Sequence, residues 1–432
     1  MKSLYTFIFI ITVGTIGFSQ SKAPAPAQER PILLLNGVAH LGNGKVIQNS
    51  AIGFENGKIT MVVDATLARF DMRKFEVINI LGKHVYPGLI VPNTELGLRE
   101  VDAVNATLDV YEVGTIKPNL RSIIAYNTDS EVIPTFRHNG VLLAQVTPRG
   151  GVIPGASSVV QLDAWNWEDA AIRVDDGIHL TWPLRTLPPR WWKNETEYRD
   201  NENYQSSVDE LDKLFADTKA YGESTNKEKN IKLEAMLGLF DGSKQLYIHA
   251  DNAKSMIEAH MFAEERGVSK VVLVGAKEAH LITDYLKEND IPVILEGVHF
   301  LPARAEEDVD LPFKKPKILF DAGVKFCLAY GTGDTSNGRN LAFMAGTAAA
   351  HGLDKEEALQ LITSNTAEIL GIAERFGTIE NDKSATLVVS EGDLLDMRTS
   401  KVTMAFIDGR KVTLSGRQEN LNEKYKKKYG QK

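Results

Sequence analysis

The sequence contains a single cysteine in 432 residues, so no disulfide can form within the chain. That residue, Cys327, lies in the apolar run VKFCLAY, which favours a small core residue. The chain also lacks an excess of positive charge, because its 49 Lys and Arg are outnumbered by 57 Asp and Glu, which gives a net charge of −8. General nucleic-acid binding needs a basic surface, so that class is excluded. The short basic segment 417–432 is predicted to be a polar, solvated tail.

The motifs of several enzyme classes are missing. The sequence has no P-loop and no G-x-S-x-G nucleophile elbow. The glycine-rich stretch GTGDTSNG, residues 331–338, follows no dinucleotide-binding fingerprint and is predicted to be a structural turn. No internal repeat is present, which leaves an ordinary globular domain with one smaller companion as the expected organisation.

Only the N-terminus has a long apolar run. Lys2 precedes it, and Ser19 and Gln20 follow it, which is typical of a secretory signal peptide over residues 1–20. An uncleaved membrane anchor is the alternative, although the run is short for a spanning helix. The Pro- and Ala-rich segment 21–30 is predicted to be a linker. We therefore expect an exported protein, periplasmic or extracellular, with no membrane attachment after cleavage.

The segments 31–83 and 376–416 have the pattern of short β-strands. Asn56-Gly57 and Asp408-Gly409 are strong hairpin-turn signals, one in each segment. Neither segment is long enough to bury a core alone, so the two are predicted to pack together as a small discontinuous β-sandwich.

Between them, residues 84–375 alternate short apolar strands with helical segments. This pattern predicts an α/β fold with a parallel sheet, and the number of strands favours a closed (β/α)8 TIM-like barrel inserted in the sandwich. A polar and aromatic insertion covers about 185–242. The eight predicted strands begin at His84, Val141, Ser158, Gly177, Gln245, Lys270, Ile291 and Val324.

In such a barrel, active-site residues lie at the carboxyl ends of the strands. The glycine-rich loop 148–158 also follows a strand and could present backbone N–H groups to a ligand. The polar residues at the strand ends are Asn93, Glu95, Gln145 to Arg149, Asp163, His179, Thr181, His249, Asp251, Glu296, His299 and Asp334.

Several motifs resemble the amidohydrolase superfamily, in particular its imidazolonepropionase-like members. LGKHVYPGLI is similar to the entry into the first barrel strand, LYIHADN to the fifth strand, and AGVKFCLAYGTGD to the eighth. HGLDKEEALQLITSNTAEILGI followed by GTIENDKSATLVV resembles the last helix and the return to the sandwich. The resemblance covers nearly all of residues 31–413.

The resemblance implies hydrolysis of non-peptide carbon–nitrogen bonds by a metal-activated water. It implies that His249 is a metal ligand and that Asp334 is both a ligand and the general base. The first strand departs from the family's His-x-His pattern, since Asn93 and Glu95 stand there, and Gly275 stands at the sixth strand where a histidine is usual.

The predicted metal ligands are therefore Glu95, His249 and Asp334, which could hold one divalent ion, zinc above others, or none. Each has a plainer alternative: Glu95 a solvated carboxylate, His249 a histidine bonded to a neighbour, Asp334 a loop cap. Asn93, His179 and His299 are predicted to contact the substrate.

The leading functional prediction is an exported amidohydrolase that acts on a small molecule, with an altered metal site. The alternative is a metal-deficient, non-catalytic barrel that binds a small molecule or pairs with an active relative. The resemblance also suggests a homo-oligomer.

Overall fold

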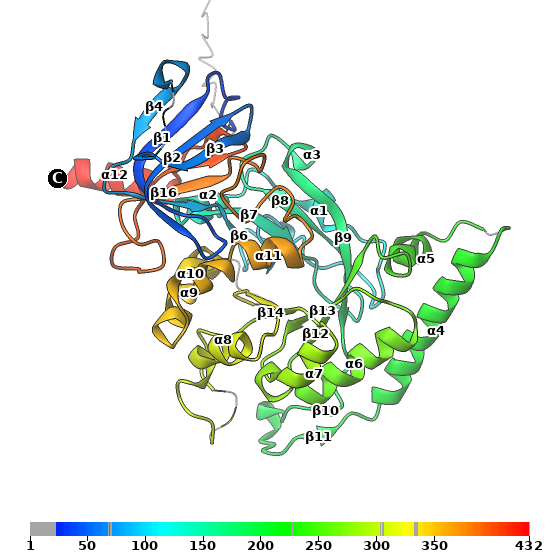
Figure 1. Ribbon diagram of the computed structural model, residues 1–432. Coiled ribbons are helices and arrows are strands. Elements are labelled where there is room, and N and C mark those ends of the chain that lie inside the picture. Colours follow the sequence, from blue (N-terminus) through cyan, green and yellow to red (C-terminus); the bar gives the residue numbers. More distant parts are fainter. Residues whose placement is uncertain are drawn as a thin grey trace, which may run out of the picture.

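The protein was analysed as a computed structural model that describes residues 23–67, 69, 71–226, 228–302, 304, 306–331 and 336–431 (Figure 1). The predicted signal peptide lies outside the described residues. Among the described residues, no helix combines the length and the apolar character needed to cross a membrane.

The first sheet forms the β-sandwich and draws its strands from both ends of the chain. The β2–β3 and β17–β18 hairpins turn at the predicted dipeptides, where Asn56, Gly57, Asp408 and Gly409 all have positive φ. The sheet runs β18-β17-β16-β5-β1-β2-β3, with β4 also paired to β1. Its strands are β1 (Ile32–His40), β2 (Val46–Glu55), β3 (Lys58–Asp64), β4 (Glu76–Asn79), β5 (His84–Pro87), β16 (Leu387–Ser390), β17 (Val402–Ile407) and β18 (Arg410–Lys411).

The two halves of this sheet share one hydrophobic core. Phe54 of β2 and Phe406 of β17 are both fully buried, and their rings meet edge to face with centroids 5.2 Å apart. Because residues so distant in sequence enclose the same core, the predicted discontinuous sandwich is confirmed.

The second sheet contains all eight predicted barrel strands, in the order β15-β14-β13-β12-β9-β8-β7-β6. The first predicted strand is divided at Gly88, so that β5 belongs to the sandwich and only β6 to the barrel. The barrel strands are β6 (Leu89–Thr94), β7 (Val141–Val146), β8 (Gly155–Gln161), β9 (Ala171–Thr181), β12 (Gln245–Ala250), β13 (Val271–Gly275), β14 (Val293–Leu295) and β15 (Phe326–Leu328).

One strand runs against the predicted direction. The TIM-like barrel architecture is confirmed, but β8 is antiparallel to both β7 and β9. The physical reason is the connection 147–154, which is too short for the crossover of a dozen or more residues that parallel neighbours require. The remaining seven strands are parallel, and their carboxyl ends form one edge, here termed the barrel mouth.

The barrel is closed between its first and last strands by a short stretch of main chain. The Ile90 N–H of β6 donates to the Ile362 carbonyl at 3.0 Å, and the Leu328 N–H of β15 donates to the Leu361 carbonyl at 3.1 Å. Residues 361–362 thus take the place of direct pairing between β6 and β15.

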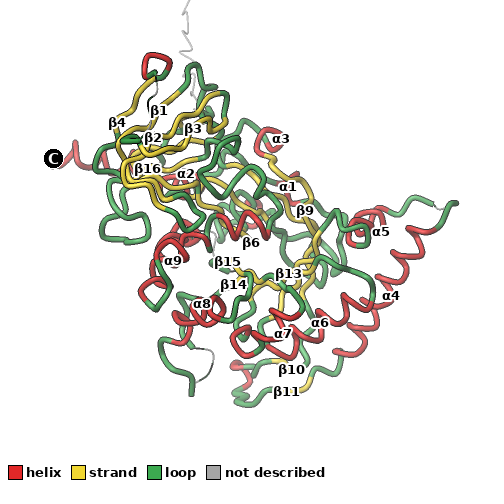
Figure 2. Tube along the Cα trace, viewed as in Figure 1, coloured by secondary structure: helices red, strands yellow, loops and turns green. Residues whose placement is uncertain are grey.

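The helices cover the outside of the barrel mainly in its second half, and α11 lies between the sandwich and the barrel (Figures 1 and 2). The segment between β9 and β12 contains the predicted insertion, with the short pair β10 (Thr186–Leu187) and β11 (Arg199–Asp200). The helices are α1 (Ser122–Ala125), α2 (Ile133–His138), α3 (Trp167–Ala170), α4 (Tyr204–Glu223), α5 (Ile231–Met236), α6 (Ala253–Glu265), α7 (Thr283–Glu288), α8 (Leu311–Asp321), α9 (Leu341–Ala350), α10 (Lys355–Gln360), α11 (Ser364–Ile369) and α12 (Arg417–Tyr429).

A buried carboxylate joins four neighbouring strands inside the barrel. Asp176 of β9 lies 2.8 Å from Gln145 Nε2 of β7, 2.7 Å from Ser157 Oγ of β8 and 2.6 Å from Tyr247 Oη of β12. The Gln145 side chain also accepts a hydrogen bond from the Asn93 N–H, at 3.1 Å. This network therefore connects the barrel interior to the end of β6.

Candidate functional site

The end of β6 turns its polar side chains into the protein. The pairing of β6 with β7 shifts register between Val91 and Thr94, and Asn93 adopts a φ of 50°, in the left-handed region that asparagine tolerates. A local irregularity of this kind re-aims side chains at a strand end. Asn93 is 1% exposed and Glu95 is 2% exposed. Both lie at the barrel mouth but neither faces open solvent.

Arg149 is the partner of both residues. Its Nε donates to Glu95 Oε1 at 3.0 Å, while its two terminal nitrogens donate to Asn93 Oδ1 at 2.7 Å and to the Asn93 carbonyl at 2.8 Å. The second Glu95 oxygen is ion-paired with Arg99 at 2.7 Å. A guanidinium that is only 6% exposed thus stands at the centre of the β6 end.

The two predicted histidines of this region form a pair. His179 Nδ1 lies 2.8 Å from His249 Nε2, and the His179 ring stacks on Tyr247 with centroids 4.7 Å apart. Burial lowers the pKa of His249 to about 3 and that of His179 well below its usual value, and the charge of Arg149 acts in the same direction. Both imidazoles are therefore neutral near pH 7. His179 Nε2 is buried and has no hydrogen-bond partner among the described residues.

Glu296 follows β14 and points to the same place. Its Oε1 accepts a hydrogen bond from Asn93 Nδ2 at 2.6 Å. Burial raises the pKa of Glu296, while Arg149 and the Asn93 bond oppose that shift. Gly331 passes close by, since a Cβ there would lie 3.2 Å from Glu296 Oε2. A carboxyl with a raised pKa in a strand-end site is a candidate proton donor or acceptor.

The end of β13 carries a glycine in a backbone conformation that other residues rarely adopt. Gly275 has a φ of 87°, and a Cβ at this position would lie 2.5 Å from Asp251 Oδ1. Asp251 is itself ion-paired with Lys277 at 2.6 Å. The glycine at the sixth strand is thus favoured by its left-handed backbone conformation.

The other predicted site residues lie elsewhere or outside the described residues. His299 is exposed, and its ring nitrogens lie 2.9 Å from Tyr330 Oη and 2.8 Å from Thr347 Oγ1. It lines a different cavity of about 660 Å³, between α9 and the loop 391–398. Asp334 falls outside the described residues, so its roles as ligand and general base stay predictions.

The described donors do not fit a metal centre. No group of three or more His, Cys, Asp and Glu side chains among the described residues is arranged to hold a metal ion. Of the predicted ligands, Glu95 is engaged by two arginines and His249 by His179. The sequence marked Arg149 and Glu296 only as strand-end residues, and no local pattern showed that they meet at Asn93.

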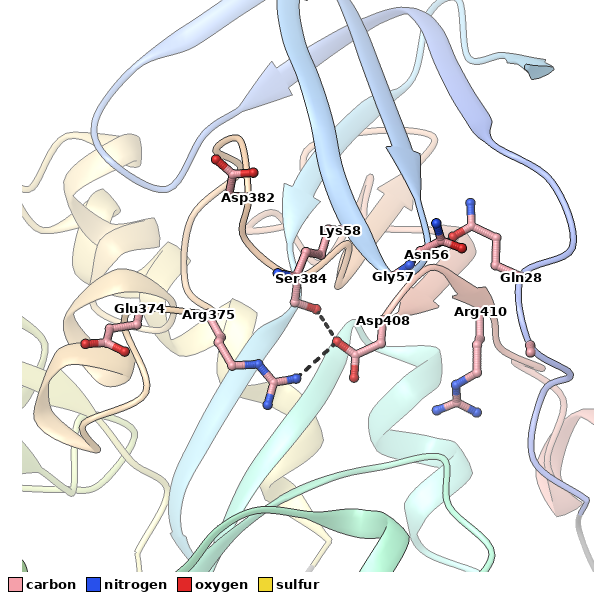
Figure 3. Close-up of a pocket in the computed structure, with 11 residues that line it drawn as sticks. Gln28, Asn56, Gly57, Lys58, Glu374, Arg375, Asp382, Ser384, Asp408 and Arg410 are labelled. Carbon is pink, nitrogen blue, oxygen red and sulfur yellow. Dashed lines mark hydrogen bonds and ion pairs between the residues drawn. The ribbon is translucent and has the colours of Figure 1, made fainter. Parts of the chain in front are cut away.

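A second polar cavity, of about 600 Å³, lies against the sandwich near its hairpin turns (Figure 3). Among its lining residues, Asp408 lies 2.7 Å from Ser384 Oγ and 3.6 Å from an Arg375 nitrogen. The cavity is lined in part by the turn residues Asn56 and Gly57. Asp408, Ser384 and Arg375 satisfy one another and hold turns in place, so the barrel mouth is the better candidate site.

Comparisons with known proteins show which family the chain resembles. The Amidohydrolase family model matches residues 191–412. The chain is 25% identical over 381 residues to imidazolonepropionase from Geobacillus kaustophilus (strain HTA426), covering 80% of this chain and 84% of that protein. It is also 25% identical to imidazolonepropionase from Bacillus thuringiensis (strain Al Hakam), with 80% and 83% covered.

Solved structures share the fold. An amidohydrolase from Thermotoga maritima MSB8 has a TM-score of 0.78 at 23% identity, covering 88% of this chain and 99% of that chain. An adenosine deaminase from Xanthomonas campestris, described with bound zinc, has a TM-score of 0.51 at 14% identity, covering 92% and 98%.

The chain therefore belongs to the amidohydrolase family, a family of hydrolases that generally depend on a metal. Within that family it is an imidazolonepropionase-like member.

Proposed function

We propose that this protein is an exported hydrolase that cleaves a non-peptide carbon–nitrogen bond in a small molecule bound at the barrel mouth. Family membership supports the reaction class. The matches to the two imidazolonepropionases span 84% and 83% of those proteins, which supports applying this class to the whole chain. The observation that carries the proposal is the meeting of Glu296 with Asn93 and Arg149 at this edge.

The arrangement provides groups for the two proton transfers of hydrolysis. A water molecule must lose a proton as it attacks, and the leaving nitrogen must gain one. A carboxyl group whose pKa is raised by burial, as at Glu296, can accept the first proton and return it. Arg149 provides a fixed positive charge for an oxygen that becomes negative during the attack. Asn93 holds Glu296 and Arg149 in place by bonding to both.

The predicted metal-activated water is a separate part of the hypothesis. A metal would supply a hydroxide at neutral pH. Because Glu95 and His249 are already engaged, no step of the proposal depends on a metal. Asp334 keeps its predicted role as a general base, and His179 and Asn93 keep theirs in substrate contact.

The test is a turnover assay on cyclic amides, ureas and amidines, following release of ammonia or opening of the ring. Glu296→Gln should lower kcat by about 10²–10⁴-fold, the usual contribution of a general acid–base group. Glu368→Gln, which removes a carboxylate from a surface ion pair with Lys325, is the matched control and should leave kcat unchanged. Full activity of Glu296→Gln would refute the assigned chemistry.

A second function, a non-catalytic binding barrel, is favoured by one observation. Both residues at the β6 end are locked by arginines instead of being open to a metal. This function predicts that a ligand raises the unfolding temperature without being consumed. Size-exclusion chromatography with light scattering, alone and with an active relative, would test the proposed homo-oligomer or mixed pair.

Export is proposed from the composition of residues 1–20. Cell fractionation and N-terminal sequencing of the mature protein test it. We expect a chain that begins close to residue 21 and is recovered outside the cytoplasm. A full-length chain recovered from the cytoplasm would contradict the proposal.

A further inference from the structure

We propose that Arg149 is the resident cation of the barrel mouth and that its guanidinium occupies the electron pairs a divalent metal would need. On this inference, the site takes no divalent metal at Glu95 and His249. The inference goes beyond the proposed function, because it holds whether or not a substrate is turned over.

The oxygen donors at the β6 end are all engaged. Arg149 binds Glu95 Oε1 at 3.0 Å, Asn93 Oδ1 at 2.7 Å and the Asn93 carbonyl at 2.8 Å. Arg99 binds the remaining Glu95 oxygen at 2.7 Å. A metal that bound Glu95 would have to displace Arg149 or Arg99 from this carboxylate, and breaking an ion pair at a carboxylate that is 2% exposed is unfavourable.

Nε2 of His249, the nitrogen of the predicted ligand, is engaged as well. His249 Nε2 and His179 Nδ1 lie 2.8 Å apart, so one of the two nitrogens carries the proton of this bond and the other provides the lone pair. A metal at His249 Nε2 would break this contact inside the barrel, where His179 is fully buried.

Charge acts in the same direction as geometry. Arginine stays protonated at all physiological pH values. A guanidinium that is 6% exposed is poorly screened, so it repels a divalent cation placed beside it. Arg149 neutralises Glu95 through one hydrogen bond, and its two further bonds to Asn93 fix the plane of the guanidinium.

The chain holds Arg149 in this position from its backbone. The Arg149 N–H donates to the Val110 carbonyl at 2.7 Å, and Lys117 Nζ donates to the Gly150 carbonyl at 3.0 Å. Gly151 has a φ of 83°, and a Cβ there would lie 2.5 Å from the Thr115 carbonyl oxygen. The loop that carries the guanidinium is thus packed tightly on both sides, and the cation is in place before any ligand arrives.

The experiment measures metal content and thermal stability together. The exported chain is purified, incubated with excess zinc, desalted and analysed by mass spectrometry for metals. The wild-type protein should retain far less than one zinc per chain, and neither zinc nor EDTA should shift its unfolding temperature. A full equivalent of zinc that is lost in His249→Ala would overturn the inference.

Variants make the test specific for Arg149. Arg149→Met removes the charge and frees Glu95 Oε1 and Asn93, so this variant should retain more zinc than wild type and be stabilised by it. Arg149→Lys keeps a positive charge and should stay free of zinc. Arg185→Met, which removes an arginine from the surface pair with Glu258, should behave as wild type.

Each outcome decides the question. If Arg149→Met does not fold, the wild-type and Arg149→Lys measurements still test the inference. If Arg149→Met folds and gains no zinc, the guanidinium is not what keeps metal out, and the inference fails. Loss of turnover in Glu296→Gln is a separate result, so a failure of the proposed hydrolysis can be distinguished from a failure here.

Discussion

We predict that the hydroxyl group of Tyr247 contributes strongly to the free energy of unfolding through its hydrogen bond inside the barrel. It lies 2.6 Å from Asp176 Oδ2, and both side chains are at most 1% exposed. Tyr247→Phe deletes this oxygen and leaves the buried carboxylate with only the bonds from Gln145 and Ser157. A hydrogen bond to a charged group contributes about 1.5–3 kcal/mol, so we expect a loss of about 2 kcal/mol in the free energy of unfolding.

Tyr126→Phe is the matched control. Tyr126 is also buried, at 5% exposed, but its hydroxyl has no hydrogen-bond partner among the described residues. Removing an unsatisfied buried hydroxyl should be neutral or stabilising. The same chemical change should therefore destabilise the protein at Tyr247 and not at Tyr126.

Urea unfolding followed by tryptophan fluorescence measures both variants, with linear extrapolation to water. Burial raises the pKa of Asp176, so as the pH falls this group becomes protonated before an ordinary aspartate does. The bond to Tyr247 then joins two neutral groups, and the cost of Tyr247→Phe should fall to about 1 kcal/mol. A Tyr247→Phe variant as stable as wild type, or a Tyr126→Phe variant as damaged, would refute the reasoning.

Three other predictions follow from buried groups outside the mouth. Asp163→Ala removes the common acceptor of two arginines and of the Ala25 N–H, so it should cost about 3–5 kcal/mol in urea unfolding and expose segment 23–30 to limited proteolysis. Burial lowers the pKa of His260, which is buried, so the stability contributed by its neutral form is complete above the unfolded pKa near 6.5 and is lost as the pH falls below that value; the unfolding midpoint of His260→Gln should therefore change less between pH 7.5 and pH 5 than that of wild type. Burial raises the pKa of Cys327 to about 12, so a thiol reagent should not modify the native protein at pH 8 and should modify it fully in urea; rapid native labelling would contradict this.

Most of the fold could be predicted from the sequence because burial leaves a pattern. The eight barrel strands are short apolar runs, and the Asn56-Gly57 and Asp408-Gly409 turns need residues that tolerate positive φ. The direction of β8 could not be read in this way, since an apolar run is the same for a parallel and an antiparallel strand. Only the length of the connection 147–154 indicates it.

The site was less predictable than the fold. Asn93 and Glu95 could be placed from their position after β6, but their partner Arg149 comes from another strand end, and sequence order does not show that the guanidinium turns back to them. Likewise, the contact between His179 and His249 depends on the register of β9 against β12. The role of Asp334 stays a prediction, since it lies outside the described residues.

The reversed strand β8 makes two connections of the barrel, 147–154 and 182–244, differ in how well they should tolerate changes in length. The loop 147–154 is tied at both ends to paired strands, so inserting or deleting a residue there would displace Arg149 or shift a strand register. The connection 182–244 joins the parallel strands β9 and β12. It already contains α4 and α5, which lie on the outside of the barrel. Directed evolution toward new ligands should therefore change the loop length only within 182–244 and keep the length of 147–154 fixed.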